Sequence, residues 1–545
     1  MTSTPRLSKR KRSLLACEPC RQRKRKCDGE TPCLTCTSWG YECHYPRQRR
    51  ARPRALTPDP PAAALGDPAR DSATNADTSA FTKSLEANSG AAFVRKIGLK
   101  VDPANAPKLN LFGWNVGMRK GPSVAAGAAI PIVDILSLSH AKTLADVYFA
   151  KVDPCYGFID ASVFFRRLDA RWSGSEGSAY DGVLAGVMAL GSLFSERNIN
   201  ITEAHLVELT RSIAETHIGS SAPSIDSVTT WALRVVYMRM TAPPYPTWIA
   251  SSTLIHLIEA SKLHQDSSDQ DDVDMRRRLI GVAQHQNIWI SYDLGLSRVS
   301  FPHDTVAMPT TRQGDFTVEL LRLLPLTTSL GPENQRHDQE IEELLLQTLG
   351  STHTQPPSTL AQCNLVLCLL RRLRMTNLTA SPSTMERIVD LLKSSLAAAR
   401  RMATTCSPWQ HVANVPFQMI SILLEMDTSA SLELLPEAMQ TLKLVASTYD
   451  TETMREAYGT ACLLIMMYER RRRADTRLLS GLLEDHQQPS GSQVLPGPIP
   501  SSNEVTWLEG LVADVPTLQG LDFTQFLQAD MARMSNSDVW DDNDV

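Results

Sequence analysis

The chain has 545 residues, of which 42% are hydrophobic and 21% are charged, and its formal net charge is −4 at pH 7. This length allows several domains and a sizeable core. No apolar run reaches the ~20 residues of a membrane-spanning helix, so we expect no membrane partner. Residues 1–54 contain 15 basic and four acidic residues, a net charge of +11. Such a block predicts a nucleic-acid partner and steeply salt-dependent binding.

Residues 1–16 form a basic arm. The arm lacks the apolar stretch of a secretory signal peptide, which favours a reducing compartment. Its four consecutive basic residues are typical of a nuclear-import signal, so we expect a nuclear protein. These residues are Lys9, Arg10, Lys11 and Arg12. The alternative is that they only add contacts to phosphates.

Six of the 11 cysteines organise the segment 17–46. The pattern C-x2-C-x6-C occurs twice, at Cys17, Cys20, Cys27, Cys33, Cys36 and Cys43. Because tetrahedral zinc takes four ligands, six thiolates can hold two zinc ions only if two of them bridge. The repeat makes Cys17 and Cys33 the expected bridges. One ion then takes Cys17, Cys20, Cys27 and Cys33, and the other takes Cys17, Cys33, Cys36 and Cys43.

Other interpretations of the cysteines are open. A three-disulfide knot would need an oxidising compartment. A mononuclear site with four of the six, or a site in which His44 replaces a cysteine, would break the repeat. Chance clustering is the remaining alternative.

A cationic run fills the loop between the second and third cysteines. It contains Arg21, Arg23, Lys24, Arg25 and Lys26, whereas the equivalent loop 37–42 is neutral to acidic. Pro19 can occupy the first turn of a short helix. Such a helix can enter the major groove of double-stranded DNA, where Arg and Lys donate to guanine O6 and N7. The alternative is that the run is only a solvated basic face. This interpretation is weak because the run lies between expected metal ligands.

The complete spacing, C-x2-C-x6-C-x5-C-x2-C-x6-C with Thr31-Pro32 before the fourth cysteine, resembles the fungal Zn2Cys6 binuclear cluster. This cluster is the DNA-binding domain of a class of fungal transcription factors. The resemblance implies CGG-type target triplets and base reading by Lys24 and Arg23. It also implies phosphate contacts from Arg21 and Lys26.

Residues 47–90 are rich in Pro, Ala, Asp, Ser and Thr, and this composition predicts a disordered linker. Many relatives of this family carry a coiled coil here that sets dimer spacing. No a/d heptad occurs between 47 and 90, and the prolines oppose one. A homodimer through this linker is therefore not expected, which favours monomeric binding or dimerisation through another region.

Residues 91–485 predict a large all-α domain of roughly 350 residues with a substantial core. A mixed segment opens it and runs through Trp114, and helical periodicity begins near residue 140. The expected helical segments are 140–170, 181–195, 203–217, 226–240, 248–264, 275–296, 338–349, 360–374, 384–403, 415–426, 431–447 and 453–480.

Several motifs in this region resemble the fungal-specific transcription factor domain, also called the middle homology region. Tyr148-Phe149 and Pro154 resemble its opening helix and turn, and residues 262–266 resemble its Gly-Leu-His-Arg-Asp motif. Residues 276–279 resemble its Arg-Arg helix. Ser297-Arg298-Val299 stands where the family has Gly-Arg-Pro. The resemblance implies a regulatory domain.

We expect no enzyme activity. His264 with Asp266 and His285 near Asp293 are interpreted as structural, because no nucleophile, phosphate loop or further metal cluster accompanies them. The remaining cysteines are expected to be buried thiols: Cys155, Cys363, Cys368, Cys406 and Cys462. A ligand cavity between the helices is a hypothesis, and the sequence names no effector.

A second linker, 486–503, precedes a tail at 504–545. The tail has nine acidic residues and one basic residue, a net charge of −8. Its acids alternate with apolar residues, which is typical of an amphipathic activation segment that meets coactivators in a groove. The apolar residues are Trp507, Leu508, Leu511, Leu518, Leu521, Phe523, Phe526, Leu527 and Trp540. The alternative is a terminal helix docked on the α domain.

The predicted fold is thus a small metal-stabilised cluster domain with two short helices and a large all-α domain, joined by disordered linkers. The predicted function is a zinc-dependent, DNA-binding RNA polymerase II transcription factor. An activator is favoured over a repressor. A zinc-cluster scaffold that contacts protein instead of DNA is the alternative from another class. Relatives of this length often control secondary-metabolite gene clusters or nutrient pathways, and the former is the favoured target class.

Overall fold

The computed structural model divides the chain into two compact units, Met1–Ala69 and Arg70–Val545. The described residues are 17, 20, 27, 33–39, 43, 89–103, 106, 117–118, 130–216, 218, 222–265, 270–300, 307–327, 330, 338–353, 355–375 and 380–486. The expected linkers fall almost wholly outside these ranges. The domain limits therefore stay a prediction.

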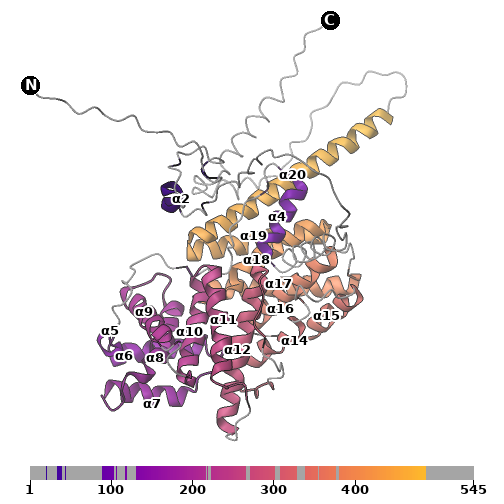
Figure 1. The fold of residues 1–545 in the computed structure, drawn as a ribbon. Helices are drawn as coiled ribbons and strands as arrows, with labels where there is room; N and C mark the ends of the chain where they lie inside the picture. The colour runs from indigo at the N-terminus through magenta and orange to yellow at the C-terminus, as the bar shows by residue number, and fades with distance from the viewer. Residues whose placement is uncertain are drawn as a thin grey trace, which may run out of the picture. The chain divides into compact units, whose positions relative to one another are not determined.

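The second unit is helical, and its described residues contain no strand. Its elements (Figure 1) are α4 (Gly90–Val101), α5 (Ile132–Ile135), α6 (Leu138–Lys151), α7 (Ala161–Trp172), η1 (Ser178–Tyr180), α8 (Asp181–Ser195), α9 (Ile201–Thr216), α10 (Ile225–Thr241), α11 (Pro244–Ala260), α12 (Gln270–Leu294), α13 (Thr317–Leu321), α14 (Leu324–Thr327), α15 (Asp338–Gly350), α16 (Pro356–Met375), α17 (Pro382–Thr404), α18 (His411–Met426), α19 (Ser429–Tyr449) and α20 (Glu452–His486). The prediction of an all-α fold is confirmed.

Side-chain caps mark where several of these helices begin. The Asp160 carboxylate accepts the Val163 N–H at 2.8 Å before α7. Thr428 and Ser431 form a reciprocal capping box before α19. Such caps satisfy backbone N–H groups that have no partner inside the helix. The sequence missed the short helices α5, α13 and α14, and it missed α4, which lies in the segment expected to be mixed.

The helix α8 is the centre of the first half of this unit, α5–α12. Every residue from Asp181 to Phe194 is buried, and α8 packs against α6, α9 and α10. A helix that is apolar on all sides belongs in a core. Glycine allows its closest contact, because a Cβ on Gly191 would lie only 2.1 Å from the carbonyl oxygen of Leu144 in α6.

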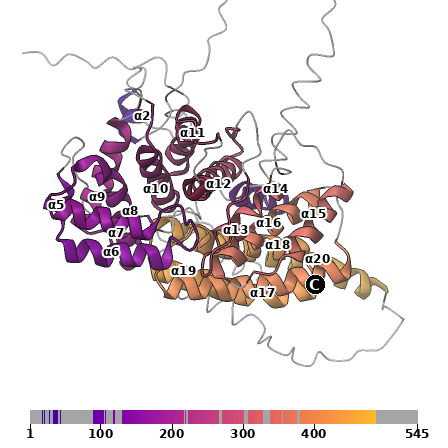
Figure 2. The same cartoon turned by 90° about the horizontal axis from the view of Figure 1, so that it is seen from below.

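The helix α18 has the same role in the second half, α15–α20. It packs against α16, α17, α19 and α20, and also against α4. The Lys100 ammonium of α4 donates to Glu425 at the end of α18 at 3.2 Å, across 325 residues of sequence. Figures 1 and 2 both place α5–α9 on one side, α15–α17 on the other and α10–α12 between them.

A fully buried arginine, Arg278 of α12, fixes this middle layer. It donates to Asp274 at 3.0 Å and to the carbonyl oxygen of Thr310 at 2.6 Å. It also pairs with Asp315 and approaches the carbonyl oxygen of Gly157 at 3.4 Å. One guanidinium therefore joins α12 to the turn before α7 and to the segment before α13. Removing it would take away the ion-pair partner of Asp315, whose side chain is only 11% exposed, and loss of a partner from such a buried pair is strongly destabilising.

The candidate catalytic histidines have structural surroundings. His285 is 2% exposed, and burial together with the charge of Arg239 lowers its pKa to about 3, so its ring is neutral. Asp293 instead accepts a hydrogen bond from Arg239 at 2.7 Å. His264 is half-buried.

Four of the five other cysteines are buried as predicted. Cys406 is only half-buried, so the prediction was wrong there. Cys406 lies in the turn after α17 and has φ 51°, a position that helical periodicity does not describe.

None of the described helices combines the length and the apolar character that crossing a membrane requires. A cavity of about 300 Å³ lies beside α12, and its lining includes Arg277, Gln284, Arg298, Met308 and Leu321. This volume is at the lower end of the range for ligand pockets. A ligand site in this unit therefore stays a prediction.

The substitution Gly191→Ala should lower the free energy of unfolding by about 3 kcal/mol, the upper end of the usual overpacking range. The new Cβ would meet a backbone carbonyl, which cannot rotate away as a side chain can. Gly177→Ala is the matched control, because a Cβ there would meet nothing within 4 Å. Urea denaturation followed by circular dichroism measures both. Equal midpoints for the two variants would contradict the close α6–α8 contact.

Candidate metal centre

The described part of the first unit is built around α2 (Leu34–Trp39). Cys33 precedes this helix and Cys36 lies in its first turn, so the three-residue spacing places both on one side. The Thr37 N–H and hydroxyl both donate to the Cys33 carbonyl oxygen, at 2.9 and 3.0 Å. Cys20, the repeat equivalent of Cys36, also has a helical backbone. The two C-x2-C pairs therefore share this feature of local structure.

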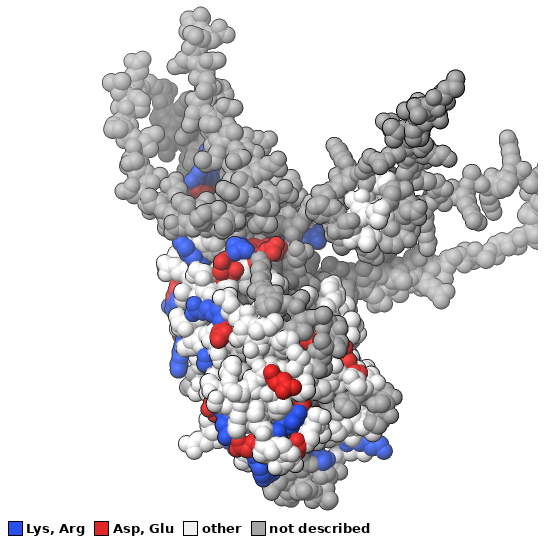
Figure 3. Space-filling model, turned by 90° about the vertical axis from the view of Figure 1, so that its left-hand side faces the viewer, with Lys and Arg blue, Asp and Glu red and all other residues white. Residues whose placement is uncertain are grey.

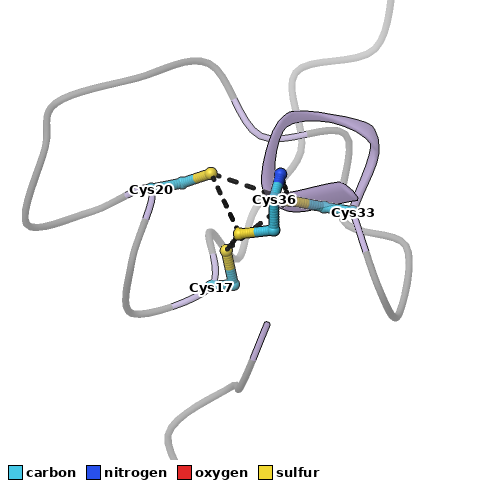
Figure 4. Close-up of side chains that lie close together, drawn as sticks. All are labelled: Cys17, Cys20, Cys33 and Cys36. Carbon is cyan, nitrogen blue, oxygen red and sulfur yellow. Dashed lines mark hydrogen bonds between the residues drawn. The ribbon is translucent and has the colours of Figure 1, made fainter. Parts of the chain in front are cut away.

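Four sulfurs point toward one another and all lie within 4.8 Å (Figure 4). The Sγ–Sγ distances are 3.7 Å for Cys17–Cys33, 3.5 Å for Cys17–Cys36, 3.6 Å for Cys20–Cys33 and 4.0 Å for Cys20–Cys36. A tetrahedral zinc with Zn–S bonds of about 2.3 Å holds its sulfurs about 3.8 Å apart. The donor set therefore fits zinc.

Disulfide bonds do not account for this cluster. The four sulfur separations are far longer than the ~2.05 Å of a disulfide, and all six cysteines are free. The alternative of a three-disulfide knot is therefore wrong. The four inner cysteines are at most 2% exposed, so their sulfurs form a small core of their own.

The two outer cysteines flank this core. The Cys27 sulfur lies 3.8 Å from that of Cys17, and the Cys43 sulfur accepts the Cys33 N–H at 3.2 Å. Each outer cysteine thus adjoins one of the two expected bridging residues. The four sulfurs that lie closest together are those of the two C-x2-C pairs. The set expected for either zinc ion instead contains one complete C-x2-C pair, one outer cysteine and one cysteine of the other pair. The bridging assignment stays a prediction.

The cluster favours a thiolate at Cys33. Burial raises the pKa of Cys33, but hydrogen bonds from the Cys36 N–H and from neighbouring thiols outweigh it and lower the pKa to about 6. The Cys36 N–H lies 3.3 Å from the Cys33 sulfur. Burial raises the pKa of Cys17, Cys20 and Cys36. Because the thiolate is the metal-binding form, zinc binding must displace protons from these three thiols.

The other sequence-predicted site residues lie outside the described residues. They are the basic segment Arg21, Arg23, Lys24, Arg25 and Lys26, the arm residues Lys9, Arg10, Lys11 and Arg12, and the tail 504–545. On the face of the molecule in Figure 3, the described Lys and Arg side chains are interspersed with Asp and Glu. This mixed surface contrasts with the +11 charge of residues 1–54.

Two family models match the chain. The fungal Zn(2)-Cys(6) binuclear cluster domain matches residues 15–52. The fungal specific transcription factor domain matches residues 145–309. The first match contains the sulfur cluster, and the second runs from within α6 to just before α13.

Full-length relatives agree with these matches. Protein RDR1 of Gibberella zeae is 39% identical over 544 residues, which cover 96% of this chain and 99% of the relative. Transcription factor kojR of Aspergillus oryzae is 33% identical over 531 residues, which cover 95% and 94%. Protein RDR1 of Saccharomyces cerevisiae is 29% identical over 511 residues, which cover 86% and 92%.

The chain therefore belongs to the fungal Zn2Cys6 zinc-cluster transcription factors. Its cluster domain binds DNA and holds two zinc ions. The family consists of transcription factors, not enzymes, in agreement with the sequence-based expectation.

Zinc content tests the bridging assignment. If Cys17 bridges, Cys17→Ala removes a ligand from both ions and should leave almost no zinc. Cys43→Ala removes a ligand from one ion and should leave about one ion, because the other retains four thiolates. Mass spectrometry of the purified full chain measures zinc, with the half-buried Cys406→Ala as a control that should retain both ions. Equal zinc loss in the first two variants would contradict bridging by Cys17.

Proposed function

We propose that the chain reads CGG-like sites in double-stranded DNA through residues 21–26 and regulates RNA polymerase II transcription. One observation supports this most directly: the cysteines at both ends of the basic segment belong to one sulfur cluster. Cys20 lies 3.6 Å from Cys33, and Cys27 lies 3.8 Å from Cys17. A segment held at both ends by the same cluster can present its cations in a fixed register.

Within this segment, Lys24 and Arg23 contact base edges. Lys and Arg donate to guanine O6 and N7 in the major groove, which is the commonest specific contact. Arg21 and Lys26 contact phosphates, and Arg25 completes the basic segment. Phosphate contacts fix the position of a protein on DNA but do not select a sequence.

The two zinc ions supply the folding free energy of this small domain when they are bound. A unit of about 30 residues has too little apolar surface to fold alone. In the proposed arrangement, Cys17 and Cys33 bridge. The other four cysteines, Cys20, Cys27, Cys36 and Cys43, complete the two sites.

Random-pool DNA selection tests this proposal with the full chain at two salt concentrations. We expect enrichment of a CGG-like motif that chelation of zinc abolishes. Lys24→Ala should retain zinc and lose about 1–3 kcal/mol of discrimination at one base pair. Arg21→Ala should weaken binding to all sequences equally and should flatten the salt dependence.

The alternative outcomes of the selection are distinct. Binding that fades with salt and enriches no motif would overturn base reading and favour a zinc-cluster scaffold that contacts protein. Retained selective binding by zinc-free protein would overturn the role of the cluster. The number and spacing of the enriched triplets distinguish a monomer from a homodimer.

We also infer that the protein acts in the nucleus, with Lys9, Arg10, Lys11 and Arg12 as its import signal, and that it is an activator. The support for activation is the tail 504–545, whose nine acids alternate with aromatic and aliphatic residues. Acids keep such side chains solvated until a coactivator groove covers them. A secondary-metabolite gene cluster is the target class that the family resemblance favours.

Deleting residues 504–545 tests the activator proposal. A reporter gene driven by the selected DNA site should lose most of its output, while DNA binding by the shortened chain stays unchanged. Increased output would support the repressor alternative. Unchanged output would show that the tail does not activate.

A further inference from the structure

The long helix α20 has two parts with different surroundings. Its first part packs against α4, α18 and α19, and Met454, Ala457 and Ala461 are fully buried there. Residues 471–481 are all exposed. Figures 1 and 2 show this end of the helix running past the neighbouring helices. We call residues 470–481 the distal part of α20.

The distal part carries both charge and apolar surface. It contains five arginines and one acidic residue, Asp475. Leu478 is 71% exposed and Leu479 is 63% exposed. These two adjacent leucines form a small apolar patch. Contiguous exposed apolar surface indicates an interaction site, whereas single exposed leucines are common and carry no such meaning.

The ion pairs along the distal part leave much of its charge accessible. Arg471 and Asp475 approach to only 3.9 Å, and both side chains are more than half exposed. Exposed pairs of this kind are weak and readily exchange partners. Arg472 differs, because it pairs with Asp427 after α18 and donates to the Tyr468 hydroxyl at 2.9 Å. Arg472 therefore anchors α20 to the core. Arg473 pairs with Glu469 one turn earlier, with 43% of its side chain still exposed, and Arg471 and Arg477 are exposed as well.

The chain itself contains a segment of complementary chemistry. Residues 504–545 carry a net charge of −8, and their first eight residues combine the acids Glu504 and Glu509 with Trp507, Leu508 and Leu511. Apolar side chains spaced for one helix face can cover the leucines of the distal part. The acids can then meet its arginines.

The connecting segment is short enough to favour this contact. It has 17 residues, 487–503, and a flexible chain of that length spans about 23 Å. Leu478 lies about 12 Å before the end of α20 at His486, from the 1.5 Å rise per residue. For linkers of this length, the general range of local concentration is millimolar when the linker is flexible.

A second copy of the chain fits the same surface less well. Two distal parts aligned side by side would bring one run of arginines against another, and like charges in register are repulsive. We therefore infer that the distal part of α20 binds the acidic tail of its own chain, residues 504–545. The docked tail then competes with coactivators for the same apolar side chains. This regulatory consequence rests on the proposed activator role, whereas the docking itself does not.

Site-specific photo-crosslinking in the full chain tests the docking. Benzoylphenylalanine in place of Leu478 should form adducts within one chain, and mass spectrometry should map them to 504–545. The matched control places the same group at Ile249 of α11, which is 59% exposed, and should give no adduct with the tail. Adducts between two chains, or no adduct with the tail, would overturn the proposal.

Charge reversal tests the chemistry of the contact. The variant R471E/R473E/R477E should lower the adduct yield roughly tenfold, since three exposed ion pairs of ordinary strength together give about that factor. The control R197E/R322E/R401E changes the net charge equally at exposed positions elsewhere and should leave the yield unchanged. Reversing Glu504, Glu509 and Asp514 to lysine should restore the lost yield. An unchanged yield in R471E/R473E/R477E would contradict an ionic contact.

A reporter assay separates this proposal from the activator proposal. The variant R471E/R473E/R477E should raise reporter output, because its tail is released. Circular dichroism checks that α20 remains helical, and L478S/L479S removes the apolar part of the contact without a charge change. Crosslinks together with unaffected output on tail deletion would overturn the activator role alone. Loss of output on tail deletion without crosslinks would overturn the docking alone.

Discussion

Metal–thiolate bonding is the constraint on which the amino-terminal unit depends. The buried cluster described there consists of cysteine side chains, with Cys17, Cys20, Cys33 and Cys36 inside and Cys27 and Cys43 packed against them. Without metal, burial raises the pKa of the Cys17, Cys20 and Cys36 thiols, whereas hydrogen bonds lower that of Cys33. Zinc therefore replaces the apolar core that a segment of this length lacks. Cys20 and Cys27, the cysteines at the two ends of the basic segment, both adjoin this cluster.

The helical unit has an independent source of stability. Its core runs through α8 and α18, and Arg278 joins α12 to two loops by hydrogen bonds from one buried guanidinium. Burial of this much apolar surface needs no metal. Loss of zinc and loss of core packing are thus separate failures.

The sequence predicted those features that depend on local spacing. The cysteine repeat indicated the cluster, and the 3.6-residue period located the long helices, with 181–195 matching α8 at both ends. Contacts between segments that are distant in the chain could not be predicted from the sequence. Periodicity gives an apolar face but not its partner, so the packing of α4 against α18 was missed. The role of Arg278 was missed because a buried arginine and a solvated one look alike in sequence.

The helix α20 shows why burial and charge must be considered together. A helix end that leaves its core gains little from intrinsic propensity, and two exposed leucines add apolar surface in contact with water. A partner that covers these leucines removes their apolar surface from water and so stabilises the helical segment. The acidic tail of the same chain has the opposite charge, the matching apolar side chains and a connection of suitable length. The acidic and apolar side chains that suit the tail to a coactivator groove also suit it to this helix. In the proposed arrangement, the distal part of α20 holds the tail until a coactivator binds it more tightly.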